Sequence, residues 1–141
     1  MEEIVKNKLK WEDFCKIAGE VNWFCPKKEM IEIALKNSQT YCLKVDGNVI
    51  GMARVVSDGA IFYCIRDFAV LPTFQNKGYG TSLFNFVLQD IKNQVKDNSA
   101  MIEIQSVKGK EEYYKKFGFI ARPSKNGGAG LYLLLSKNNK M

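Results

Sequence analysis

A short glycine-containing turn between two apolar runs is the feature that most constrains this chain. The apolar run 61–71 and the amphipathic run 83–95 flank Gln75-Asn76-Lys77-Gly78-Tyr79-Gly80-Thr81. The first run is typical of a strand and the second of a helix, so the turn opens a helix. The first amides of a helix lack intrahelical partners and carry the positive end of its dipole. The turn therefore predicts a binding site for a phosphate group.

The composition is that of an ordinary globular protein. The chain has 141 residues, of which 46% are hydrophobic and 26% charged, and this predicts a single domain, 1–141, with its own core. No apolar run reaches the roughly 20 residues that a membrane span needs. The N-terminus starts acidic and shows no secretory signal, so we expect a cytoplasmic protein that does not bind membranes.

Charge and cysteine usage exclude several classes of function. The net charge is +6, carried mostly by lysines scattered along the chain, whereas a nucleic-acid surface more often clusters arginines with aromatics. The four cysteines have no CxxC spacing and the chain has no histidine. This pattern predicts no metal site and free, buried thiols. Without histidine, Ser-His and Cys-His catalysis are excluded, and a general base must be a carboxylate, water or another group.

Hydrophobic periodicity predicts an α/β (α+β) domain around a mostly antiparallel sheet. The three middle strands form an antiparallel meander, and the strand after the long helix is expected to pair in parallel with the third of them. The predicted strands are 3–7, 40–45, 49–56, 61–71, 101–107, 117–120 and 131–135. The predicted helices are 11–18 before Gly19, 26–35 with Pro26 in its first turn, 83–95 and 109–116, and the tail 137–141 is expected to fray.

Two other phosphate-binding patterns fit the glycine turn poorly. A Walker A loop needs GxxxxGK[ST], and no lysine follows a suitably placed glycine here. A dinucleotide fingerprint needs GxGxxG, and the run 78–83 lacks the third glycine. That fingerprint would also come early in an alternating βαβ pattern, not after an antiparallel meander.

Two motifs resemble the acyl-CoA-dependent N-acyltransferases of the GNAT superfamily. Gln75-x-x-Gly78-x-Gly80 is similar to the family's acyl-CoA signature, which is an arginine or glutamine, two residues, glycine, one residue, then glycine or alanine. The run Tyr113-Tyr114-Lys115-Lys116-Phe117-Gly118-Phe119 is similar to its aromatic-tyrosine-x-x-x-glycine-phenylalanine motif. The order of elements agrees from about residue 40 to 119. The resemblance implies flanking helices and a splay between the fourth and fifth strands.

The resemblance also implies a co-substrate and a reaction. It implies an N-acetyltransferase that moves an acetyl group from acetyl-CoA to a primary amine of a small molecule by direct attack, without a metal. The pantetheine arm of coenzyme A would pair with the main chain of Phe68, Ala69 and Val70. The pyrophosphate would bind Gln75, Asn76, Lys77, Gly78, Tyr79, Gly80 and Thr81, where the glycines let the backbone approach it.

Two residues are candidates for the chemistry. The family's tyrosine at the position of Tyr114 usually contacts the cofactor sulfur, so Tyr114 is expected to give a proton or a hydrogen bond to the departing thiolate. Asp67 is a candidate to bind the amine or take its proton, because a charge in a central strand is costly unless it is paired or solvated. A core role for Tyr114 and a structural ion pair for Asp67 stay open, and Glu103 is a rival base.

The resemblance also implies an oxyanion site and an acceptor pocket, and it leaves alternative functions open. The main-chain N–H of Val70 or Phe68 would hold the developing oxyanion. Trp23 would line the acceptor pocket, or would belong to the core instead. A non-catalytic acyl-CoA-binding or regulatory domain stays open, as does an acetyltransferase for protein lysines or N-termini. A homodimer is compatible with the family, and the acceptor amine is not specified by the sequence.

Overall fold

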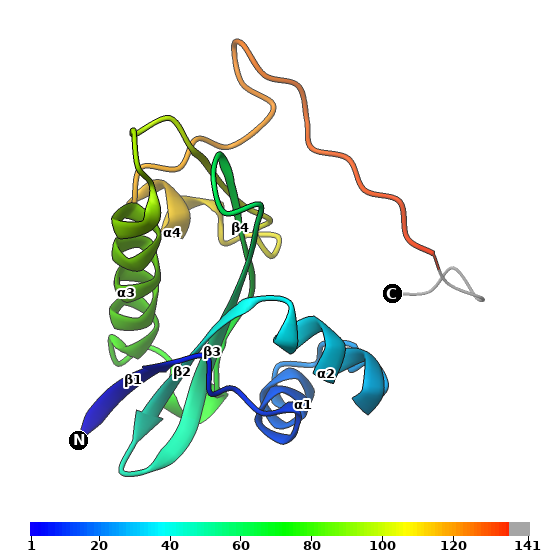
Figure 1. Ribbon diagram of the computed structural model, residues 1–141, viewed down its shortest axis with the longest axis vertical. Helices are drawn as coiled ribbons and strands as arrows, with labels where there is room; N and C mark the ends of the chain where they lie inside the picture. The colour runs from blue at the N-terminus through cyan, green and yellow to red at the C-terminus, as the bar shows by residue number, and fades with distance from the viewer. Residues whose placement is uncertain (136–141) are drawn as a thin grey trace. The chain divides into compact units, whose positions relative to one another are not determined.

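The computed structural model describes residues 1–135, which fall into two compact units. We call Met1–Ile104 the sheet unit and the part from Gln105 onward the C-terminal unit. The predicted frayed tail, 137–141, lies outside the described residues. In chain order the elements are β1 (Glu2–Lys6), α1 (Trp11–Glu20), α2 (Lys28–Lys36), β2 (Gln39–Val45), β3 (Asn48–Ser57), β4 (Phe62–Val70), η1 (Pro72–Phe74), α3 (Tyr79–Gln94), β5 (Met101–Ile104) and α4 (Glu111–Lys115) (Figure 1).

The sheet unit is built on five strands in the order β1-β2-β3-β4-β5. The first four pair antiparallel and β5 pairs in parallel with β4, so the predicted meander and the parallel addition after α3 are confirmed. The predicted hairpin turn after β2 holds Asp46 and Gly47 with φ of 51° and 84°. Two left-handed residues match the twist of the flanking strands, which is why this dipeptide suits the turn.

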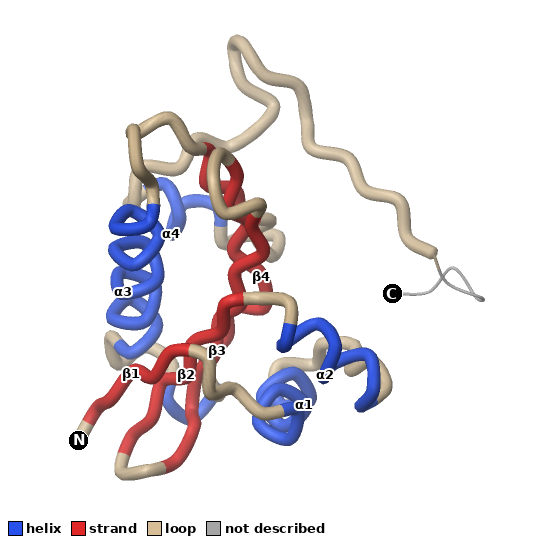
Figure 2. Tube along the Cα trace, in the orientation of Figure 1, coloured by secondary structure: helices blue, strands red, loops and turns tan. Residues whose placement is uncertain are grey.

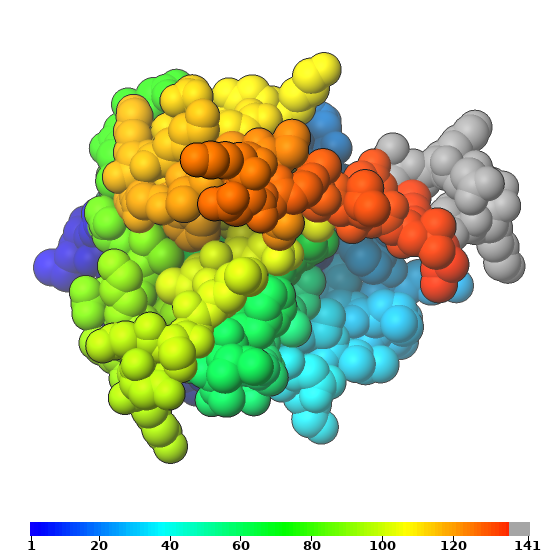
Figure 3. Space-filling model, turned by 90° about the horizontal axis from the view of Figure 1, so that it is seen from above, coloured from blue at the N-terminus to red at the C-terminus, as the bar shows by residue number. Residues whose placement is uncertain are grey.

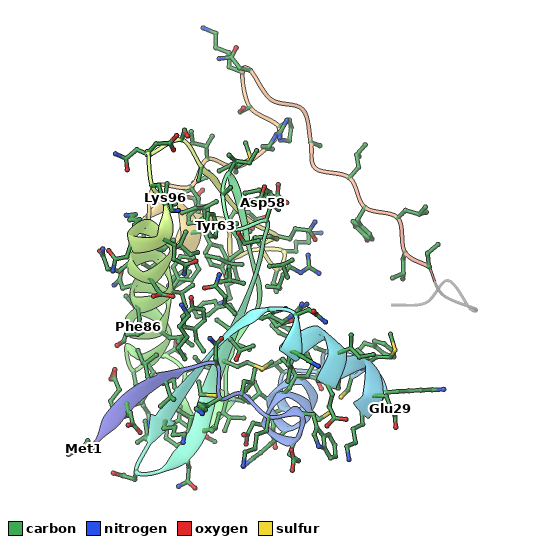
Figure 4. The ribbon with its side chains drawn as sticks, viewed as in Figure 1. Met1, Glu29, Asp58, Tyr63, Phe86 and Lys96 are labelled. Atoms are coloured by element: carbon green, nitrogen blue, oxygen red, sulfur yellow. The ribbon has the colours of Figure 1, made fainter. Side chains whose placement is uncertain are left out.

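Helices cover both sides of this sheet. The helices α1 and α2 lie on one side and α3 lies on the other (Figure 1). Tyr63 of β4, which is 1% exposed, lies on the side that faces α3 (Figure 4). The apolar stripe predicted for α3 is buried, apart from Val95, which is half-buried and follows the helix as its C-cap. The buried members are Leu83, Phe84, Val87, Leu88 and Ile91.

Several predicted helix boundaries were wrong by a few residues: α3 begins at Tyr79 instead of residue 83, and α4 spans Glu111–Lys115 instead of 109–116. Pro26 lies before α2 rather than in its first turn, because Lys27 is extended (φ −61°, ψ 147°) and the helix begins only at Lys28. Gly19 does not end α1, since the helix continues to Glu20. A glycine without a left-handed backbone gives no stop signal.

β4 and β5 separate after a short shared stretch. Their ladder joins only Phe62–Ile65 to Met101–Ile104, and β5 ends there instead of at the predicted residue 107. β4 continues to Val70. Among the described residues, the stretch 66–70 therefore has a strand partner on its β3 side only. The predicted splay between the fourth and fifth strands is confirmed.

The C-terminal unit contains α4 and little other regular structure. The strands predicted at 117–120 and 131–135 are absent from it, and the second stretch is extended chain without a paired neighbour (Figure 2). An extended segment counts as a strand only when another strand supplies hydrogen bonds, and in this unit the described bridge joins only Ser124 and Gly127. Leu131, Tyr132, Leu133 and Leu135 are 85–91% exposed, and their orange-to-red stretch is in full view in Figure 3.

No helix within residues 1–135 combines the length and the apolar character required to cross a bilayer.

Candidate functional site

The predicted phosphate-binding turn joins β4 to α3 through η1. Gly78, the residue before α3, is left-handed (φ 89°), and so is Asn76 (φ 62°). The first main-chain hydrogen bond of α3 runs from the N–H of Ser82 to the carbonyl of Gly78, at 3.1 Å. The amides of a first helical turn have no intrahelical acceptor, and here they start at Tyr79. The local backbone is therefore arranged as an anion site requires.

Side chains around the helix start set its charge. α3 has no acidic residue in its first turn. The hydroxyl of Ser82 donates a 2.6 Å hydrogen bond to the carboxylate of Glu2 of β1. Lys77 is exposed, and its Nζ atom lies 5.8 Å from the centre of the Phe74 ring. An anion bound at this helix start would therefore lie near the positive charge of Lys77 and the negative charge of Glu2.

Gln75 fastens the turn to β4. Its Nε2 atom donates a 2.8 Å hydrogen bond to the carbonyl oxygen of Val70. The side chain of Gln75, predicted to bind the cofactor, is thus engaged with the main chain of the other predicted cofactor segment. This bond fixes the distance between the end of β4 and the turn that leads into α3.

The predicted pantetheine segment belongs to the part of β4 that follows its ladder with β5. Ala69 and Val70 pair with Met52 and Gly51 of β3, while no described strand adjoins them on the β5 side. The ring of Phe68 lies 5.1 Å from the ring of Phe84 of α3, centre to centre, which anchors this stretch to the helix. An unpaired strand edge can accept an extended, amide-containing ligand as an added strand.

Asp67 lies in a bulge of β4. Arg66 pairs with Arg54 and Ala69 with Met52, so Asp67 and Phe68 together oppose a single β3 residue. Asp67 has a left-handed backbone, with φ of 52°. Such a conformation costs a non-glycine residue about 1–2 kcal/mol, although aspartate tolerates it better than most. Bulges re-aim side chains and are common beside active sites.

The carboxylate of Asp67 is already engaged. Its Oδ2 atom accepts a 2.6 Å hydrogen bond from Nε of Arg54, and the two side chains are 21% and 19% exposed. Arg54 also donates a 3.2 Å hydrogen bond to the hydroxyl of Ser38. Sequence reasoning missed Arg54 and Ser38. The turn at 57–61 was the signal that could have identified Arg54. In an antiparallel hairpin, residues at equal distances before and after the turn face each other, so residue 54 lies opposite residue 66, next to Asp67.

The remaining sheet-unit candidates are partly accessible. Trp23 lies in the link between α1 and α2 and is half-buried, so it is not a core residue. Its main-chain N–H donates a 2.8 Å hydrogen bond to the carbonyl of Ala18, which folds the link back onto α1. Glu103, the rival base, is exposed on β5.

Tyr114 belongs to α4 in the C-terminal unit. Its ring contacts those of Tyr113 and Phe119, with centres 5.2 Å and 6.4 Å away. Burial, and to a smaller extent the charge of Tyr113, raises the pKa of Tyr114 to about 12. The phenol is therefore protonated at neutral pH and acts as a hydrogen-bond donor.

The thiols differ from the prediction. All four cysteines are free, but only Cys42 is buried, and Cys15, Cys25 and Cys64 are half-buried. Cys15 lies in α1 and Cys64 in β4, where periodicity alone does not separate a core from a boundary position, and Cys25 lies in the link between α1 and α2. Burial raises the pKa of Cys42 to about 11. Residues 1–135 contain no group of three or more candidate metal ligands.

Comparisons with known proteins agree with this arrangement. The sequence profile described as "Acetyltransferase (GNAT) domain" matches residues 18–134. An uncharacterized N-acetyltransferase, ycf52 of Pyropia yezoensis, is 29% identical over 122 residues, which cover 82% of this chain and 67% of that protein. A probable acetyltransferase from meticillin-resistant Staphylococcus aureus has a TM-score of 0.83 and 27% identity, covering 96% of this chain and 100% of its own.

One further structure contains a bound ligand. A GNAT family acetyltransferase from Elizabethkingia anophelis, solved with acetyl-CoA bound, has a TM-score of 0.65 and 23% identity over 85% of this chain and 76% of its own. At that identity the likeness concerns the fold. The profile match extends over most of the chain and over both motifs, and the chain therefore belongs to the GNAT family of acetyltransferases.

Proposed function

We propose that residues 1–141 act as one acetyltransferase domain, which moves an acetyl group from acetyl-CoA to a primary amine of a small molecule. One observation carries the proposal. The start of α3 follows closely on the end of β4, where no described strand adjoins Ala69 and Val70 on the β5 side, and Gln75 ties the two together. A helix start suits a pyrophosphate and an unpaired edge suits an amide-containing arm, and coenzyme A contains both groups in sequence.

Acetyl-CoA, the acetyl donor, is bound mainly by main-chain groups in this proposal. The amides from Tyr79 onward bind the pyrophosphate, with Lys77 as the added cation. Phe68, Ala69 and Val70 pair with the pantetheine arm. Support for acetyl-CoA as the donor comes from the family and from the Elizabethkingia relative.

The reaction is a direct attack. The neutral amine nitrogen attacks the thioester carbonyl, the C–N bond forms, and the C–S bond breaks to release a thiolate. A main-chain N–H of Phe68 or Val70 stabilises the developing oxyanion. The nitrogen loses one proton, and the thiolate gains either a proton or a hydrogen bond.

Asp67 is the proposed group for the amine. Arg54 holds its Oδ2 atom, whereas Oδ1 has no hydrogen-bond partner among the described residues. Oδ1 can therefore bind the amine and receive its proton, directly or through water. Arg54 fixes the carboxylate in the bulge while it does so.

Tyr114 is the proposed group for the thiolate. With the pKa of Tyr114 at about 12 and that of a thiol at ~8.5, complete proton transfer to the thiolate is unfavourable. Tyr114 then acts by donating a hydrogen bond that stabilises the leaving thiolate, and the proton that ends on sulfur comes from solvent.

Two measurements test the proposal. Acetyl-CoA at 100 times its Kd should raise the free energy of unfolding by ~2.7 kcal/mol, seen as a higher Tm. Acetyl-CoA with a panel of small amines should release thiol, followed with a thiol reagent, and peptides with free lysines or N-termini serve as the comparison. Absence of thermal stabilisation would refute the donor assignment. Stabilisation without thiol release would instead favour a non-catalytic acyl-CoA-binding domain.

A further inference from the structure

Two arginines lie next to each other on one face of the sheet. Arg54 of β3 and Arg66 of β4 are register partners, so their side chains project from the same face. Arg54 reaches Ser38, just after α2, which identifies this as the face that α1 and α2 lie on (Figure 1). Like charges directly opposite each other on adjacent strands are destabilising. Such a pair needs a counter-charge from the protein or from a ligand.

The protein supplies that counter-charge to only one of them. Arg54 is bound to Asp67 at 2.6 Å and is 19% exposed. Arg66 is exposed, and no carboxylate of the described residues lies within ion-pair distance of it. Burial raises the pKa of the Cys64 thiol, two residues earlier on β4, and the charge of Arg66 acts in the opposite direction. The guanidinium of Arg66 therefore keeps most of its donors for a ligand.

One further carboxylate lies on the same face of the sheet as Arg66. Glu103 of β5 is the register partner of Cys64, so its exposed side chain lies on the same face. It acts on Cys64 electrostatically, as do both arginines. Asp67 is bound to Arg54, and Glu103 forms no described ion pair with Arg66. A small ligand group can therefore approach Arg66 without displacing an existing ion pair.

Arg66 is also close to the expected reaction centre. It precedes Asp67 directly and Phe68 by two residues, which corresponds to ~6 Å along a strand. The proposed amine position beside Asp67 is thus within reach of an arginine side chain. A compound that places an anionic group one or two carbon atoms from its amine would contact both residues.

We infer that the acceptor is an amine that carries a carboxylate close to its nitrogen, as amino acids do, and that Arg66 binds this carboxylate. The inference rests on the proposed N-acetyltransferase function. Arginine suits the task because its planar fork matches the two oxygens of a carboxylate. Asp67 holds the amine at one end of the acceptor and Arg66 holds the carboxylate at the other.

Matched acceptors test the inference. Each of several amino acids is compared with the amine that lacks its carboxylate, and phosphoethanolamine is compared with ethanolamine. The wild-type protein should show a kcat/KM at least tenfold higher for the amino acids. R66Q should raise their KM tenfold to a hundredfold, as expected for a lost charged hydrogen bond, and change the decarboxylated amines less than twofold. R66K should recover part of the loss.

K92Q is the matched charge control. Lys92 is exposed on the last turn of α3, on the other side of the sheet, so this variant removes the same charge without touching the face of Arg66. Equal losses for both members of each pair in R66Q, or a wild-type preference for the decarboxylated amines, would overturn the inference. A preference confined to phosphoethanolamine would show that Arg66 binds a phosphate group and would overturn the inference that it binds a carboxylate.

A binding measurement separates this inference from the proposed function. N-acetyl amino acids, the expected products, should raise the Tm of wild-type protein and of K92Q but not of R66Q. Turnover of amines without any preference for carboxylate would leave the acetyltransferase function intact and remove the role of Arg66. A third outcome is that acetyl-CoA raises the Tm but no amine is acetylated and the N-acetyl amino acids have no effect. That outcome would refute both the acetyltransferase function and the role of Arg66.

Discussion

Arg54 of β3 donates a 2.6 Å hydrogen bond to Asp67, the residue at which β4 adopts a left-handed backbone. The bond joins two strands at the point where two β4 residues oppose one β3 residue. Since a left-handed aspartate carries a backbone cost, the ion pair offsets part of it. The carboxylate proposed for the amine and the geometry of the bulge are therefore coupled.

Asp67→Asn should lower turnover more than the loss of its ion pair explains. The amide cannot accept a proton, so we expect kcat/KM to fall at least tenfold further than in Arg54→Gln, which breaks the same ion pair but keeps the carboxylate. Both variants should lose about 1–2 kcal/mol of stability in urea unfolding, as for a charged hydrogen bond that is partly screened by solvent. Equal losses of turnover would make Asp67 a structural residue.

Tyr114→Phe should lower kcat about a hundredfold, as for the loss of one hydrogen-bond donor to a developing charge, and leave stabilisation by acetyl-CoA unchanged. Tyr113→Phe is the matched control, since it removes the neighbouring hydroxyl in the same helix and should keep kcat within about threefold, the spread usual for a residue outside the chemistry. An unchanged kcat in Tyr114→Phe, with acyl transfer shown to limit the rate, would exclude Tyr114.

The pH profile offers a separate check on the same residue. The pKa of Tyr114 is raised to about 12, so the donating, protonated form is fully present at neutral pH and is lost only as the pH rises through that value. The kcat of the wild-type protein should therefore show no alkaline decline due to Tyr114 below about pH 11. A decline between pH 8 and 10 that disappears in Tyr114→Phe would contradict the raised pKa.

Gly78→Ala should weaken both the fold and the binding of acetyl-CoA. Gly78 is left-handed, and although a Cβ would meet nothing within 4 Å, alanine in that conformation costs about 1–2 kcal/mol. Relief of this strain would move the amides at the start of α3. Gly19→Ala, inside α1 with open space around it, should stabilise the protein by about 0.5–1 kcal/mol. Urea unfolding and acetyl-CoA titration of the two variants give the comparison.

Asp90 should make the free energy of unfolding depend on pH in the acidic range. Burial raises its pKa, but hydrogen bonds from Lys6, Tyr41 and Gln94 outweigh that and hold the pKa below its usual value. A lowered folded-state pKa contributes stability above the unfolded value of ~3.9, and this stability is lost as the pH falls through the folded-state value. Asp90→Asn should be less stable at pH 7 by about 1–2 kcal/mol and should lose less stability than wild type between pH 5 and pH 3. Parallel pH curves for the two proteins would contradict this role.

Local patterns predicted most of the sheet unit. The turn at 46–48, the meander, the stripe of α3 and the parallel position of β5 all depend on residues close in sequence, whose periodicity and turn chemistry act alike in most contexts. The strands predicted at 117–120 and 131–135 failed for the complementary reason. An apolar, β-prone segment becomes a strand only when a partner strand lies beside it, and residue type does not specify that partner.

The sequence by itself determined that a strand, a glycine turn and a helix follow one another, because these depend on backbone preferences of neighbouring residues. It also determined the family motifs at Gln75–Gly80 and Tyr113–Phe119. Only the tertiary structure decided that β4 bulges at Asp67, that Arg54 binds this carboxylate and that Arg66 does not share it. Those facts depend on the register between strands, where a shift of a single residue changes which charges meet.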